Sequence, residues 1–220
     1  MEKQEIIYKT RAFVKDALAG AEAGHDWFHI ERVYNNALRI AETEKADPFI
    51  VALGALLHDI ADSKFHDGDE SVGPKKARAF LEMLEVEDNI IEQIEGIISN
   101  ISFKNTLSGK NPASFDSPEL RVIRDADRLD AIGAIGIARA FNYGGFKNRK
   151  LYDPNIPPAF QQTKENYKNS AAPTINHFYE KLLLLKDRMH TKTGKKMAAK
   201  RHRFMEKFLE EFYREWNSND

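Results

Sequence analysis

The chain has 220 residues, of which 42% are hydrophobic and 30% charged, and its formal net charge at pH 7 is −1. This composition indicates a globular protein with a substantial core, and the near-zero charge gives no general attraction to nucleic acid or to membrane surfaces. The absence of cysteine excludes disulfides and thiolate catalysis, and no apolar run approaches the ~20 residues of a membrane span, so a cytoplasmic protein is expected.

The predicted elements are nearly all helices, because apolar residues recur at helical spacing and alternating strand patterns are almost absent. Asp26 is placed to cap the second helix, on which Phe28 is expected to face the core. Asp47 followed by Pro48 gives the third helix a cap and a first-turn proline. In chain order, the expected helices span residues 3–19, 27–44, 48–57, 74–84, 88–101, 119–129 and 131–141, followed by two or three helices over 160–216.

Two segments between these helices are expected to be irregular. They are residues 102–117 and residues 142–158, and the second is rich in glycine, proline and asparagine and long enough to suggest a functional loop. No repeat and no Pro/Ser-rich linker divides the chain. The sequence therefore predicts an all-α, single-domain helical bundle over residues 1–220, with C-terminal helices over about 160–216.

Polar residues that could bind a metal lie near junctions between buried and polar runs at three points of the chain. His58 and Asp59 end the run PFIVALGALL, where an unsatisfied neutral polar group would cost roughly 2–7 kcal/mol and a charge far more. His29 lies in the first turn of the second helix, and Asp127 lies where RVIRDADRLD changes from apolar to charged. Two imidazoles and two carboxylates suit a divalent ion that keeps positions open for water and a phosphate oxygen.

Two residues after the histidine–aspartate pair are candidates for catalysis. Asp62 falls four residues after His58 and three after Asp59, on the same face if the helix continues. It is then placed to act as an acid–base group without binding the metal, and the alternative is a structural hydrogen bond. Lys64 adds a positive charge suited to a substrate phosphate, and the alternative is a solvated lysine.

Three basic features are further candidates for substrate or nucleic-acid contact. Arg128 can reach phosphate or neutralise the flanking aspartates. Residues 141–150, with aromatics, glycines and Lys147, fit either a lid that stacks on a base and contacts phosphate or an ordinary surface loop. The basic segment 186–207 fits a nucleic-acid patch, but its apolar stripe favours a docked helix with a solvated face.

The order of these motifs resembles the HD superfamily of metal-dependent phosphohydrolases. HDWFHIERV, ALLHDIADSKF and DADRLDAIGAIGIARAF, over about 25–141, are most similar to the bacterial YpgQ/YedJ-like subgroup. The resemblance implies an HD-fold bundle with the metal site among converging helices. It also implies one divalent ion, Mn²⁺ first and Mg²⁺, Fe²⁺, Co²⁺, Ni²⁺ or Zn²⁺ as alternatives, with four ligands: His29, His58, Asp59 and Asp127.

The same resemblance implies the hydrolysis of nucleoside or deoxynucleoside triphosphates to monophosphate and pyrophosphate. A nucleoside 5′-monophosphatase and a cyclic-nucleotide phosphodiesterase are alternatives within the class. A catalytically silent, nucleotide-sensing HD module is the alternative from another class. The expected partner is a small-molecule nucleotide. Nucleic acid and membrane are not expected, and a homodimer is left open.

Overall fold

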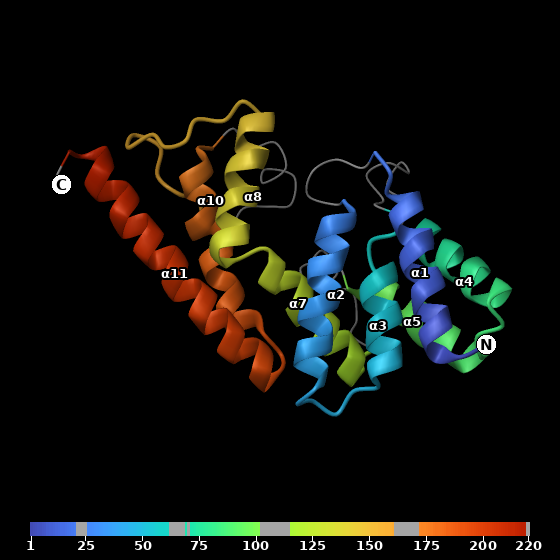
Figure 1. Ribbon diagram of the computed structural model, residues 1–220. Helices are drawn as coiled ribbons and strands as arrows, with labels where there is room; N and C mark the ends of the chain where they lie inside the picture. Colours follow the sequence, from blue (N-terminus) through green and yellow to red (C-terminus); the bar gives the residue numbers. More distant parts are fainter. Residues whose placement is uncertain (21–25, 62–68, 70, 102–114, 161–171, 219–220) are drawn as a thin grey trace. The chain divides into compact units, whose positions relative to one another are not determined.

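The computed structural model describes residues 1–20, 26–61, 69, 71–101, 115–160 and 172–218 (Figure 1). These residues form helices and turns without a strand, so the all-α prediction is confirmed. Their contacts cluster into two compact units, Met1–Asp127 and Arg128–Asp220. Among the described helices, none is long and apolar enough to cross a membrane.

In the N-terminal unit, helices pack around α3, which is apolar on all sides. Every residue of α3 from Phe49 to Leu57 is buried, and α1, α2 and α5 all contact this helix, as expected for a helix with no polar face. The Asp47 side chain accepts hydrogen bonds from the first turn of α3. The unit contains α1 (Lys3–Ala17), α2 (Trp27–Ala41), α3 (Pro48–Leu57), α4 (Val72–Met83), α5 (Asp88–Asn100) and most of α7 (Pro118–Asp130).

The expected inward position of Phe28 is wrong, since its side chain is 62% exposed. The buried residues of α2 are His29, Ile30, Val33, Ala37 and Ile40, and at 3.6 residues per turn they form one stripe. Phe28 falls on the opposite side of the helix, so its apolar character does not place it in the core. The stripe instead brings His29 to the buried side.

The C-terminal unit contains α8 (Gly133–Phe146), α10 (Thr174–Glu180), the 3₁₀ helix η2 (Leu182–Arg188) and α11 (Lys192–Trp216). Helix α11 packs against α8 and η2 and buries Met205 and Leu209. The basic segment 186–207 therefore includes part of a docked helix, which agrees with the second interpretation of that segment.

Helix α8 is longer than predicted, because residues 142–146 are helical rather than irregular. Gly144 is buried there, and a Cβ at this position would lie 2.1 Å from the Oγ1 of Thr174. Close packing of α8 on α10 thus outweighs the poor helix propensity of two successive glycines. The irregular connection begins at about residue 147 instead.

Candidate metal centre

The first turn of α2 places His29 on the buried side of the N-terminal unit. The Asp26 carboxylate accepts a hydrogen bond from the backbone N–H of His29 at 2.9 Å, which is the N-cap contact that the sequence predicts. The imidazole is only 2% exposed. Helix α2 therefore fixes both the backbone and the surroundings of this histidine.

The end of α3 places His58 and Asp59. The helix stops at Leu57, and the N–H of Ile60 returns to the Leu57 carbonyl at 3.2 Å in a tighter turn. The α-helix therefore does not continue past Leu57 within the described residues, and Asp62, whose expected helical alignment with His58 depended on such a continuation, lies outside those residues. The chain leaves the buried helix α3 at this turn, where the polar residues His58 and Asp59 follow.

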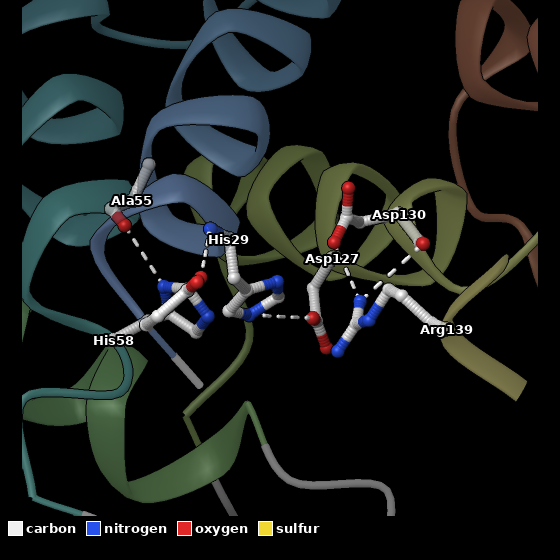
Figure 2. Close-up of polar contacts among 7 residues, drawn as sticks. His29, Ala55, His58, Asp127, Asp130 and Arg139 are labelled. Carbon is white, nitrogen blue, oxygen red and sulfur yellow. Dashed lines mark hydrogen bonds and ion pairs between the residues drawn. The ribbon is translucent and has the colours of Figure 1, made fainter. Parts of the chain in front are cut away.

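The His58 ring is fixed by a hydrogen bond to its own helix. Its Nδ1 lies 2.8 Å from the carbonyl oxygen of Ala55 (Figure 2). A carbonyl can only accept, so Nδ1 donates and Nε2 of the neutral ring keeps its lone pair. Burial lowers the pKa of His58, against the opposing attraction of Asp127 and Asp59. Burial thus favours the neutral imidazole, which is the form that binds metal, and the Ala55 contact selects the tautomer with a free Nε2.

The candidate ligands converge in the N-terminal unit. Ligand atoms of His29, His58 and Asp59 all lie within 4.8 Å of one another. Nε2 of His29 lies 3.6 Å from Oδ1 of Asp127, on the last turn of α7 (Figure 2). Two atoms bound to one ion at about 2.1 Å each lie roughly 3–4 Å apart, so this spacing fits a shared divalent ion better than a direct hydrogen bond.

The structure describes contacts of two of the other predicted site residues, Arg128 and Lys147. Asp62 and Lys64 lie outside the described residues. The guanidinium of Arg128 donates a hydrogen bond to the carbonyl oxygen of Arg188 in the C-terminal unit. Lys147 lies over an aromatic ring of α8, with Nζ 5.0 Å from the centroid of Phe146.

Two features near the candidate ligands were not predicted from the sequence. One is the Ala55 carbonyl, which is a backbone atom and carries no sequence signal. The other is the ion pair of Asp130 with Arg139, which involves residues nine positions apart on two different helices. From the sequence, Arg128 is the candidate partner of these flanking aspartates.

Comparisons with known proteins agree with this helical fold. A family model described as HD domain matches residues 27–132. The chain is also 35% identical over 219 residues to YpgQ of Bacillus subtilis (strain 168), described as an uncharacterised protein, and the match covers 95% of this chain and 93% of YpgQ.

Solved structures extend the similarity over nearly the whole chain. One is an HD-superfamily hydrolase from Bacillus thuringiensis, with 45% identity, a TM-score of 0.78 and coverage of 98% of this chain and 99% of the other. Another is B. subtilis YpgQ in complex with ADP, with 32% identity, a TM-score of 0.74 and coverage of 98% and 97%. The chain therefore belongs to the HD superfamily of hydrolases, a family of metal-dependent phosphohydrolases.

Proposed function

We propose that this HD-superfamily hydrolase cleaves nucleoside or deoxynucleoside triphosphates to monophosphate and pyrophosphate. The convergence of two imidazoles and a carboxylate within 4.8 Å carries the proposal of a metal-dependent site. The ADP complex of YpgQ, a relative over nearly the full chain, supports a nucleotide as the ligand. The cleavage position rests on the resemblance of the motifs to the YpgQ/YedJ-like subgroup.

Four residues are proposed to hold a single divalent ion, with Mn²⁺ expected first: His29, His58, Asp59 and Asp127. Their mixed nitrogen and oxygen donors suit several first-row ions and Mg²⁺. Such an ion, when bound, polarises a phosphoryl oxygen and makes water more acidic. The contact of the His58 ring with the Ala55 carbonyl supports Nε2 as its donor atom.

The remaining proposed roles belong to residues that would contact substrate. Asp62, three residues after Asp59, would orient the attacking water or give a proton to the leaving oxygen. Lys64 would offset charge on the phosphoryl group during transfer. Arg128 and Lys147 are proposed to contact the phosphate chain, and the exposed ring of Phe146 beside Lys147 offers a surface for a base.

A nucleotide panel with separate readouts of pyrophosphate, orthophosphate and linear nucleotide tests this function. The panel contains ribo- and deoxyribonucleoside triphosphates, monophosphates and cyclic nucleotides, each with Mn²⁺, Mg²⁺, Co²⁺, Ni²⁺ and Zn²⁺. We expect pyrophosphate from triphosphates in the wild type and none from Asp127→Ala. Asp16→Ala, an aspartate exposed on α1, is the matched control and should retain activity.

The other outcomes separate the alternatives. Orthophosphate from monophosphates identifies a monophosphatase, and a linear product from cyclic nucleotides identifies a phosphodiesterase. Nucleotide binding without turnover, by protein shown to contain metal, identifies a sensing module. Each of these results overturns the proposed pyrophosphate-releasing reaction.

A further inference from the structure

The last turn of α7 carries Asp127, and the helix ends three residues later at Asp130. The final carbonyl groups of a helix have no partner within it, so a terminal turn frays unless other groups donate to it. The direction of the Asp127 carboxylate depends on the backbone of this turn. Whatever holds the turn therefore affects where that carboxylate lies.

Two arginines from later helices donate to this turn. Arg201 of α11 donates to the carbonyl oxygen of Leu129. Nη1 of Arg139, on α8, donates to the Asp130 carbonyl oxygen at 3.3 Å and to its carboxylate at 2.5 Å (Figure 2). Both guanidinium groups thus bind the backbone of the turn that follows Asp127.

Backbone hydrogen bonds complete the same turn. The N–H of Ala131 donates to the Arg128 carbonyl at 3.1 Å, and the N–H of Ile132 donates to the Leu129 carbonyl at 3.3 Å. Together with the two guanidinium groups, these bonds give a partner to each carbonyl of residues 128–130. The end of α7 is therefore fixed rather than frayed.

The corner between α7 and α8 leaves little room for this arrangement to shift. Gly133 has φ +77°, and a Cβ there would lie 3.0 Å from the side-chain carbons of Arg201. A left-handed backbone at this position favours glycine. The stem of Arg201 thus lies against the corner while its guanidinium donates to α7.

The Asp130–Arg139 pair is poorly explained by stability alone. The Asp130 carboxylate is only 1% exposed and lies at a helix C-terminus, where the helix dipole disfavours negative charge. Replacing a buried ion pair by apolar residues is often neutral or stabilising. A pair in such an unfavourable place is better explained by the geometry that it imposes on the turn.

We propose that Arg139 and Arg201 are positioning residues that preorganise Asp127 for metal binding by holding the last turn of α7. The inference rests on the proposed metal site. It assigns a function to two arginines that are not among the four proposed metal ligands. Loss of a group that orients a metal ligand typically weakens metal affinity by about 10–100-fold, and the indirect contact here places the expected loss at about 10-fold.

Calorimetric titration of the full-length protein with Mn²⁺ tests the inference. Arg139→Gln should raise the Kd for Mn²⁺ about 10-fold, and Arg139→Lys, which keeps the charge with a single donor group, should fall between Arg139→Gln and the wild type. Met205→Ala is the control for general destabilisation, because Met205 is buried in α11. It should lower the melting temperature and leave the Kd unchanged.

The outcomes separate the inference from the metal site on which it rests. If the wild type binds no divalent ion, the metal site itself is wrong and the inference falls with it. If Asp127→Ala loses the ion but Arg139→Gln binds it with wild-type affinity, the site stands and the positioning role is overturned. An equal rise in the Kd for Mn²⁺ in Met205→Ala and Arg139→Gln also overturns that role, because the rise would then reflect only lost stability.

Discussion

Replacing Gly136 with alanine should destabilise the protein, because the fold leaves no space for a Cβ there. That Cβ would lie 2.3 Å from the carbonyl oxygen of Ala131 and 2.5 Å from its carbonyl carbon. Both are backbone atoms, so the corner between α7 and α8 would have to move. Overpacking costs typically about 1–3 kcal/mol, and the helix preference of alanine over glycine returns about 0.5–1 kcal/mol. The expected net loss is about 1 kcal/mol.

Gly145 provides the matched control on the same helix. It is exposed, and a Cβ at this position would meet nothing within 4 Å. Gly145→Ala should therefore stabilise the protein by about 0.5–1 kcal/mol, since only the helix preference changes. Urea unfolding followed by far-UV circular dichroism gives both free energies by linear extrapolation.

The directions in which the two variants shift the urea midpoint show whether the corner between α7 and α8 is tightly packed. The close approach of the Ala131 carbonyl predicts opposite shifts of the urea midpoint, down for Gly136→Ala and up for Gly145→Ala. If both variants gain stability by a similar amount, the corner is looser than described. Steric contact at this corner would then not hold the end of α7 rigid.

Three further predictions concern pH, capping and metal. Burial, aided by Lys181 and Arg149, lowers the pKa of His177 to about 3. Below pH 6.5 the unfolded chain therefore binds a proton at His177 that the folded chain does not bind. The free energy of unfolding consequently falls as the pH falls. Urea unfolding should show that the wild type loses about 2 kcal/mol more than His177→Gln between pH 7 and pH 5, and equal losses would contradict this. Asp47→Ala removes the cap of α3 and should lower the stability measured by thermal unfolding by about 1 kcal/mol. Asp47→Ser can still cap the helix and should keep most of that stability. Mn²⁺ at 100 times its Kd should stabilise the wild type by about 2.7 kcal/mol, seen as a higher melting temperature, and a similar rise in Asp59→Asn would contradict the proposed ligand set.

The sequence predicts α3 well, because its start and its interior carry independent signals. Asp47 and Pro48 mark the first turn, and the run to Leu57 is apolar on every side, so burial follows whatever packs around it. Phe28 shows that an apolar side chain alone does not predict burial. Its apolar side chain suggested the core, but its position on α2 lies outside the buried stripe, and position rather than hydrophobicity decided its exposure.

Helix α8 shows where local signals fail. Gly144 and Gly145 indicate a break in the sequence, yet the helix continues to Phe146 because close packing against Thr174 requires a residue without a side chain. That requirement arises between residues 30 positions apart. No local sequence pattern indicates this packing requirement.

The candidate ligands could be predicted as a set because each ends or begins a buried helical run. His29, the pair at 58–59 and Asp127 all occupy such junctions, and helix ends can converge on one ion. The groups that orient them could not be predicted in the same way. Ala55 acts through its backbone carbonyl, and Arg201 reaches a residue 72 positions earlier, so both contacts exist only once the helices have packed.

Mn²⁺ binding followed by electron paramagnetic resonance tests the central claim most directly, with each of the four candidate ligands replaced singly. The variants are His29→Ala, His58→Ala, Asp59→Ala and Asp127→Ala, beside the Asp16→Ala control. We expect one tightly bound ion per chain in the wild type and the control, and its loss or severe weakening in all four ligand variants. Wild-type Mn²⁺ affinity in those four variants would contradict a metal centre at this site.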